Sequence, residues 1–150
     1  MDDVDRKILA ELQQDGRLTL TELAERVRLS VSPCHRRLRT LERDGMIDGY
    51  HAHLNARALG LTFEALVFVT MRGADHDTVA AFEQAVLTIT NVVQAQRLFG
   101  DPDYLLRVIT HDLPDFQRVY DTRLSTLPGV QRLSSTLVMK SIADNRPLPV

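Results

Sequence analysis

The order of strand-like and helix-like segments after residue 63 constrains this chain most. Apolar and β-branched runs there alternate with stretches whose apolar residues recur every three or four positions. The expected strands are 65–72, 92–99, 104–110 and 130–142, and the expected helices are 75–88 and 112–124. The order βαββαβ is the split βαβ, or ferredoxin-like, arrangement. A tight turn at 100–103 and a Pro128-Gly129 turn separate the later strands.

Two helices can cover only one face of such a sheet. The other face would also carry apolar side chains, and monomeric proteins rarely expose a large apolar surface. A second copy of the chain is therefore the expected cover, which makes a homodimer the expected assembly.

Residues before 54 carry helix signals instead. One helix is expected at 3–14, with Asp2 or Asp3 as its cap, and Thr19 and Glu22 form a capping box that opens a second helix at 20–27. Arg28 then occupies a turn position that needs a positive φ, at a cost of about 1 kcal/mol for a residue other than glycine. A further helix follows, so the pattern predicts a helix-turn-helix.

The third helix lies in the segment from Leu29 to Gly45. Ser30 is expected to cap its start, Pro33 fits its first turn, and Gly45 can end it. One edge is apolar and is formed by Cys34, Leu38 and Leu41. The candidate DNA contacts on the outward side are Ser32, His35, Arg36, Arg39, Thr40 and Arg43.

The charge distribution supports a DNA-facing helix. The chain has a formal net charge of -2, yet the segment 26–43 holds six arginines (26, 28, 36, 37, 39 and 43) against one acid, Glu42. An acidic remainder opposes unguided phosphate binding and leaves this patch to direct contact with DNA. The alternative is a solvated basic helix. Arg37 lies nearer the flank, where it contacts phosphate or pairs with Glu42 or another acid.

Apolar and polar residues alternate loosely over 45–54, so this segment is expected to form a strand or a small wing. The expected fold is α+β, with an N-terminal winged helix-turn-helix of three helices and a C-terminal ferredoxin-like βαββαβ domain. The expected domains are 1–54 for DNA binding and 63–150 for effector binding and oligomerisation, joined by a linker at 55–62.

Composition excludes several classes of protein. Apolar residues make up 44% of the chain, and no apolar run approaches the roughly 20 residues of a membrane span. The N-terminus does not resemble a signal peptide, so a cytoplasmic protein without a membrane partner is expected. Cys34 is the single cysteine, which excludes an internal disulfide and fits a small buried apolar residue.

Enzymatic and metal-binding chemistry finds little support in the residues. His51 and His53 alternate on one strand face without further ligands, so they are expected at the surface and no metal site is expected. No phosphate-binding loop or nucleophile–base pair is present. An enzyme on a ferredoxin-like domain is therefore the weakest alternative, and a regulatory protein that binds a small molecule but not DNA is the other.

The whole pattern resembles the leucine-responsive/asparagine-responsive (Lrp/AsnC) family of transcription regulators. No single motif is specific, but their order and spacing together are. The residues that carry the resemblance are Asp5 to Leu9, Leu23-Ala24, Leu29-Ser30, Pro33-Cys34, Arg37, Leu41-Glu42, Gly45 to Ile47, Gly49-Tyr50, Gly100, Asp103-Tyr104 and Pro128 to Val130.

The resemblance implies a function for each domain. The N-terminal domain would bind double-stranded DNA at a roughly palindromic site, and the C-terminal domain would form dimers that assemble into tetramers or octamers. A small molecule, usually an amino acid, would bind between C-terminal domains, and no other cofactor is expected. The residues expected to bind this effector are Gly100, Asp101, Pro102, Asp103, Tyr104, Ser134 and Thr136.

The turn itself has chemistry that suits an amino acid. Its free backbone N–H groups would donate hydrogen bonds to a carboxylate, and its two aspartates, Asp101 and Asp103, would attract an ammonium group. From the residues alone, a plain connection between two strands remains the alternative.

Overall fold

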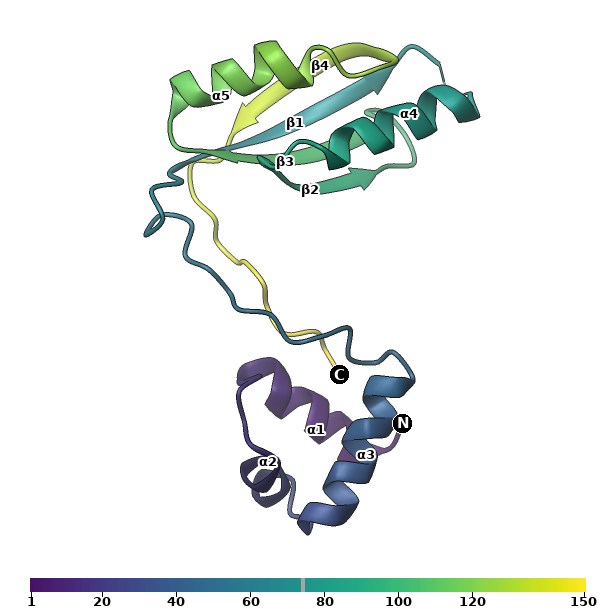
Figure 1. The fold of residues 1–150 in the computed structure, drawn as a ribbon, viewed down its shortest axis with the longest axis vertical. Coiled ribbons are helices and arrows are strands. Elements are labelled where there is room, and N and C mark those ends of the chain that lie inside the picture. The colour runs from purple at the N-terminus through teal and green to yellow at the C-terminus, as the bar shows by residue number, and fades with distance from the viewer. Residues whose placement is uncertain (74) are drawn as a thin grey trace. The chain divides into compact units, whose positions relative to one another are not determined.

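A computed structural model describes residues 1–73 and 75–150 of the chain. The chain folds into two compact units, which are described separately below (Figure 1). The first, here called the helical unit, comprises Met1–His53 together with Ile142–Val150, and the second, the sheet unit, comprises Leu54–Ser141. The domain boundaries expected from the sequence stay predictions.

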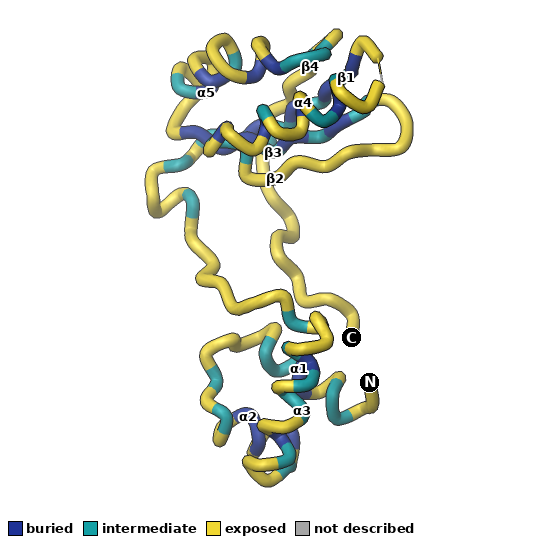
Figure 2. The backbone as a smooth tube through the Cα atoms, turned by 45° about the vertical axis from the view of Figure 1, so that its right-hand side comes forward, coloured by how far each residue is buried: buried dark blue, intermediate teal, exposed yellow. Residues whose placement is uncertain are grey.

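The helical unit contains three helices, α1 (Asp3–Gln14), α2 (Leu20–Arg26) and α3 (Val31–Arg43). Their apolar edges form one core (Figure 2). Its buried residues are Ile8, Leu9, Leu23, Ala24, Val27, Cys34 and Leu41. Cys34 is fully buried, and burial raises the pKa of its thiol, as befits a residue that packs as a small apolar group.

Local capping explains where these helices begin. Asp2 caps α1 in a capping box with Asp5, and the box of Thr19 and Glu22 that the sequence predicts is present at α2. Ser30 stands at the N-cap position of α3, but its side chain makes no capping hydrogen bond, so that part of the prediction is wrong.

The turn between α2 and α3 has the predicted conformation. Arg28 has φ +58°, in the left-handed region that costs most residues about 1–2 kcal/mol. The chain must reverse sharply at this point, because Leu29 N–H donates to Ala24 O at 2.9 Å and α3 starts two residues later.

Replacing Arg28 by glycine is expected to stabilise the helical unit by about 0.5–1 kcal/mol. The change relieves the strain at φ +58° and loses part of that gain to the greater freedom of glycine in the unfolded chain. Urea unfolding followed by circular dichroism measures the difference. Glu25→Gly, three residues earlier within α2, is the control and should destabilise by about 1 kcal/mol. A loss of stability in Arg28→Gly would show that the turn is not strained.

The end of α3 follows the sequence, but the segment after it does not. Gly45 has φ +71°, and Met46 N–H donates to Leu41 O at 2.9 Å, which closes a Schellman motif. Residues 47–54 contain no helix or strand, so the strand predicted at 45–54 is wrong for this chain. A strand needs a neighbour to accept its backbone hydrogen bonds, and no strand of the described residues pairs with this segment.

The sheet unit has the βαββαβ order that the sequence predicts, which confirms the ferredoxin-like fold (Figure 1). Its elements are β1 (Phe63–Met71), α4 (His76–Leu87), β2 (Val92–Arg97), β3 (Tyr104–Thr110), α5 (Leu113–Val119), the π-helical turn η1 (Tyr120–Leu124) and β4 (Val130–Leu137). The strands form one antiparallel sheet in the order β2-β3-β1-β4.

Three elements end differently from the sequence expectation, and the first is β2, which ends at Arg97 instead of residue 99. The helix expected at 112–124 finishes in a π turn, in which Ser125 N–H donates to Tyr120 O at 2.9 Å. The strand expected at 130–142 ends at Leu137, which pairs with Ala65 near the start of β1. Val138 N–H still donates to Glu64 O at 3.0 Å, but β1 begins at Phe63, so residues 139–142 have no neighbouring strand within the described residues to pair with.

The two faces of the sheet differ in cover. Helices α4 and α5 pack on one face of the sheet (Figure 1). On that face Val67, Leu106 and Phe82 belong to the core and are almost fully buried. The opposite face, here called the open face, carries alternate residues of the same strands. Leu66, Phe68 and Leu105 on this face remain partly exposed in the single chain.

Candidate nucleic-acid interface and ligand site

The outward side of α3 presents the side chains that the sequence singles out. The inward edge is covered, because Cys34 and Leu41 are buried in the core of the helical unit. All but one of the candidate contacts are exposed, and Thr40 is half-buried. The exposed candidates are Ser32, His35, Arg36, Arg39 and Arg43.

The arginines on this side differ in how they are paired. Arg43 donates to Asp44 at 2.9 Å, and Arg39 lies 3.7 Å from Glu42, so both guanidinium groups have an acidic neighbour. No ion pair to Arg36 is found among the described residues, and its backbone carbonyl accepts the Thr40 hydroxyl at 3.1 Å. Arg36 is therefore the arginine of this face with the least compensated charge.

Arg37 has a different role, which settles the alternative that the sequence leaves open. Its guanidinium donates to Asp2 at 2.7 Å and to Asp5 at 2.8 Å, at the start of α1. The backbone N–H of Asp5, with the Arg37 guanidinium, lowers the pKa of Asp2. Arg37 thus ties α3 to the N-terminus of α1 and is not a free phosphate contact.

The turn between β2 and β3 is held at the end of the sheet by Asp103. Its carboxylate accepts the Met71 N–H at 2.7 Å, its own N–H donates to Val69 O at 2.9 Å, and its carbonyl accepts Leu98 N–H at 2.7 Å. Asp103 therefore joins the turn to β1. Gly100 and Asp101 are exposed at the tip of the turn, while Pro102 is half-buried.

Tyr104, the predicted site residue that directly follows the turn, points away from the open face. Its ring packs against Phe82 with centroids 4.5 Å apart, and its hydroxyl donates to Glu83 Oε1 at 2.8 Å. Burial, helped by the hydrogen bond to Glu83, raises the pKa of Tyr104 to about 12. The sequence alone does not single out Glu83. It lies in α4, and only the folded sheet unit brings that helix against Tyr104 of β3.

Alkaline pH is expected to destabilise the sheet unit through Tyr104. Its folded-state pKa lies above the ordinary value of 10.0, so its contribution is fully present below pH 10 and is lost as the pH rises through about 12. The free energy of unfolding should fall by roughly 2–3 kcal/mol across this window. Urea unfolding at successive pH values measures the fall, and Tyr104→Phe should lack it. An equal fall in both proteins would contradict this role of Tyr104.

The two hydroxyl candidates on the last strand lie apart from Tyr104. Ser134 pairs with Phe68 and Thr136 pairs with Leu66, so both belong to the open face and both are exposed. Ser134 sits near the end of β1 that also receives Asp103, but β1 runs between them in the sheet order. The turn and Ser134 are thus close to one end of the sheet, and Tyr104 supports that end from the helix-covered face.

The part of the chain that the structure describes contains neither a metal site nor a membrane-spanning helix. No group of three or more His, Cys, Asp or Glu side chains within residues 1–73 and 75–150 could hold a metal ion. In the same part of the chain, no helix combines the length and the apolar character that a membrane crossing requires.

Comparison with known proteins agrees with both halves of this architecture. The family model "Winged helix-turn-helix DNA-binding" matches residues 1–48, and the family model "Lrp/AsnC ligand binding domain" matches residues 64–148. The chain belongs to the Lrp/AsnC family. It is a transcriptional regulator with a winged helix-turn-helix DNA-binding domain and a ligand-binding domain, and not an enzyme.

Relatives of this Lrp/AsnC protein match it along almost the whole chain. The Bkd operon transcriptional regulator of Pseudomonas aeruginosa is 36% identical over 142 residues, covering 95% of this chain and 93% of that protein. The leucine-responsive regulatory protein of Escherichia coli K12 is 35% identical over 150 residues, covering 100% of this chain and 92% of that protein.

Solved structures give the same result. A transcriptional regulator of Neisseria meningitidis in complex with L-Met has a TM-score of 0.94 and 38% identity, with 99% of this chain and 96% of that chain covered. An AsnC family transcriptional regulator of Agrobacterium tumefaciens has a TM-score of 0.93 and 32% identity, with coverages of 99% and 97%.

Proposed function

We propose that this Lrp/AsnC regulator reads a specific DNA sequence through the outward side of α3. The observation that carries the proposal is the exposed guanidinium of Arg36, on a helix face shared with Ser32 and opposite the buried Cys34. Arginine donates two hydrogen bonds to the guanine edge in the major groove, which is the commonest specific contact. Arg39, Arg43, Thr40 and His35 would add phosphate or base contacts from the same face.

The assembly that suits this function is a homodimer. The open face of the sheet unit leaves Leu66, Phe68 and Leu105 partly exposed, and a second copy would bury them. A two-fold dimer would offer two α3 helices to two half-sites about one DNA turn apart. Dimers would assemble further into tetramers or octamers, which present more helices to longer sites.

The effector we propose is an amino acid bound at the turn of residues 100–103. The tip of the turn, Gly100 and Asp101, is exposed, and Asp101 together with the half-buried Asp103 would supply negative charge for an ammonium group. Ser134 and Thr136 on the open face would contribute hydroxyl groups, with Tyr104 supporting the turn from behind. The names of the relatives support an amino acid, since one is leucine-responsive and one solved structure holds L-Met.

Two measurements test this function on the pure protein. Selection from a random pool of duplexes should enrich a roughly palindromic sequence, and titration of the enriched duplex should show binding that weakens steeply with salt. Light scattering with each of the twenty amino acids should show a change of size with one or a few of them. A pool that stays random would favour a regulator that binds a small molecule but not DNA.

Replacing Asp103 by asparagine is expected to separate its structural role, as the acceptor of the Met71 N–H, from its proposed role in binding the effector. The amide oxygen of Asp103→Asn can still accept the Met71 N–H, but the negative charge is gone. The amino-acid concentration for half response should rise at least tenfold while stability changes by less than about 1 kcal/mol. Asp103→Ala should lose the response and about 2 kcal/mol of stability, because it leaves the Met71 N–H without its charged acceptor.

The matched control is Asp121→Asn, which removes the same charge from an exposed position on η1. Its response should equal that of the wild type. An unchanged response in Asp103→Asn would remove the carboxylate of Asp103 from the effector site and leave it as a structural residue.

A further inference from the structure

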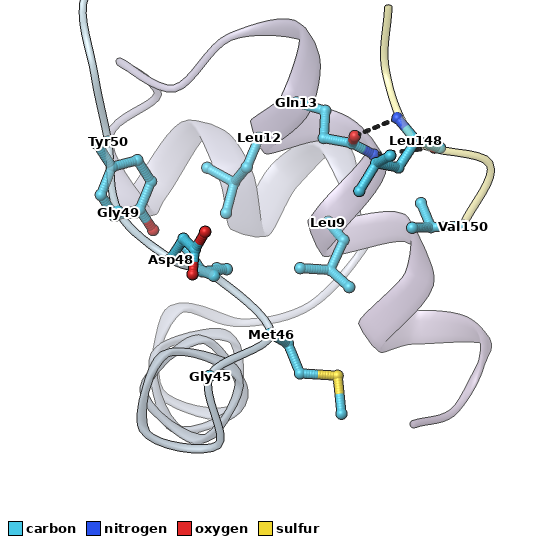
Figure 3. Close-up of a pocket in the computed structure, with 11 residues that line it drawn as sticks. Leu9, Leu12, Gln13, Gly45, Met46, Asp48, Gly49, Tyr50, Leu148 and Val150 are labelled. Carbon is cyan, nitrogen blue, oxygen red and sulfur yellow. Dashed lines mark hydrogen bonds between the residues drawn. The ribbon is translucent and has the colours of Figure 1, made fainter. Parts of the chain in front are cut away.

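The last nine residues belong to the helical unit, and two of them, Leu148 and Val150, border a groove on its surface. The groove lies between α1 and the segment that follows α3, and it encloses about 460 Å³ (Figure 3). Its apolar lining comes from α1 and from the segment after Gly45. Residues Leu9, Leu12, Met46, Ile47 and Tyr50 form this lining, and we call the hollow they surround the tail groove. Leu148 and Val150 of the tail, here residues 145–150, form its remaining wall.

The side-chain amide of Gln13 makes hydrogen bonds to both the backbone N–H and the backbone carbonyl of Leu148 in the tail. The N–H of Leu148 donates to Gln13 Oε1 at 2.6 Å, and Gln13 Nε2 donates to Leu148 O at 3.2 Å (Figure 3). The side-chain amide thus pairs with the tail as a neighbouring β-strand would. Pro147 and Pro149 have no backbone N–H, so Leu148 is the single residue of the three that can make this pair. The register of the tail is therefore fixed.

The sequence of the tail lowers the cost of binding. Each proline fixes its own φ and restricts the residue before it to extended conformations, so the tail is close to its bound shape before it binds. A second contact lies at the start of the tail, where the side-chain amide nitrogen of Asn145 is hydrogen-bonded to the Nε2 ring nitrogen of His53. Asn145 has φ +47°, which asparagine tolerates better than most residues and which turns the chain towards the groove.

We propose that the surface of α1 around Gln13, at the edge of the tail groove, is a binding site for the chain's own residues 145–150, and that the bound tail is a releasable strap on the helical unit. The chain passes between the two units at 53–54 and again at 141–142. A bound tail therefore adds a second connection between the sheet unit and α1 of the helical unit. Arg37 in turn joins α1 to α3, the recognition helix whose outward side is proposed to read DNA. This second connection would limit how far the recognition helix α3 can move relative to the sheet unit.

The contacts make the strap weak enough to open. Leu148 remains 71% exposed, so backbone pairing contributes more to tail binding than burial of apolar surface does. Two hydrogen bonds near the surface hold a tethered segment with an equilibrium constant of order ten. The strap is thus bound most of the time, and a modest change in either unit can release it.

Hydrogen–deuterium exchange on the full chain tests the binding site. The amide of Leu148 should exchange roughly tenfold more slowly than in the free peptide of residues 142–150. Gln13→Ala should remove this protection. Gln14→Ala is the matched control, since Gln14 is the adjacent exposed glutamine of α1, and it should keep the protection. Equal protection in Gln13→Ala and the wild type would overturn the proposal.

Mixing two defective chains tests whether the tail binds its own chain. Gln13→Ala keeps the tail but lacks its acceptor, and a chain that ends at Ser141 keeps Gln13 but lacks the tail. Protection of the Leu148 amide should stay absent in the mixture. Its return would show that the tail crosses to a second copy, which would overturn binding within one chain.

The effect of the strap on DNA rests on the proposed function and is measured separately. The chain that ends at Ser141 should bind a selected two-half-site duplex about tenfold more weakly, because its two recognition helices are held less well together. Its affinity for a single half-site should not change. Loss of both affinities would show that the tail supports the fold of the helical unit, and would overturn the strap. If the full chain binds no duplex, the proposed function fails, while the exchange measurements still decide whether the tail is bound.

Discussion

Replacing Gly129 by alanine is expected to destabilise the sheet unit by about 2–5 kcal/mol. Gly129 has φ +71°, and a Cβ built there would lie 2.2 Å from Thr78 Cγ2 and 2.9 Å from Met71 Cε. The left-handed conformation costs about 1–2 kcal/mol, and forcing a methyl group into a packed site costs about 1–3 kcal/mol. The backbone cannot move away easily, since Gly129 O accepts Arg72 N–H at 2.8 Å.

Two further variants separate the steric cost from the conformational cost. Gly45 also has φ +71° but has nothing within 4 Å of its Cβ position, so Gly45→Ala should cost only about 1 kcal/mol. Thr78→Ser removes the methyl group nearest to the new side chain and should restore about 1–2 kcal/mol in the Gly129→Ala background. Urea unfolding at a fixed protein concentration measures all three, because self-association changes apparent stability.

Equal costs at Gly129 and Gly45 would contradict the close packing of α4 on this turn. An absence of rescue by Thr78→Ser would show that the Met71 side chain, and not Thr78, sets the limit.

Replacing Arg36 by alanine is expected to weaken binding to the selected duplex by about thirtyfold or more. One bidentate arginine–guanine contact contributes about 1–3 kcal/mol of discrimination, and a dimer on a palindromic site loses two of them. Binding to an unrelated duplex should fall far less, because it depends on phosphate charge. Titration of both duplexes at one salt concentration gives the ratio that decides the role of Arg36.

Arg17→Ala is the control, because it removes the same charge from an exposed residue between α1 and α2. It should weaken both duplexes slightly and to the same extent. If Arg36→Ala and Arg17→Ala behave alike, the effect is one of net charge, and the outward side of α3 is not the reading face. Stability of Arg36→Ala should match the wild type, since Arg36 is exposed.

Several features of the site could be predicted because they depend on neighbours in the sequence. The outward direction of Arg36 follows from the helical spacing of Cys34, Leu38 and Leu41, which the core of the helical unit buries or partly buries. The positive φ of Arg28 follows from the short connection between two helices.

Other features depend on partners that lie far away along the chain. Arg37 stands near Glu42 in the sequence yet pairs with Asp2 and Asp5, which only the packing of α1 on α3 brings within reach. Asp103 looks like a free acid of an exposed turn, but its carboxylate holds the Met71 N–H at the end of β1.

The sequence by itself determined the order of helices and strands along the chain and the family of this regulator. Capping boxes, apolar periodicity and glycine turns act over a few residues, so they can be recognised without a structure. The tertiary structure decided the rest: that residues 45–54 form no strand, that β4 ends at Leu137, and that Tyr104 faces Glu83. It also showed that the tail binds Gln13. Each of these depends on whether a backbone or side-chain group finds a distant partner, and local pattern carries no information about that partner.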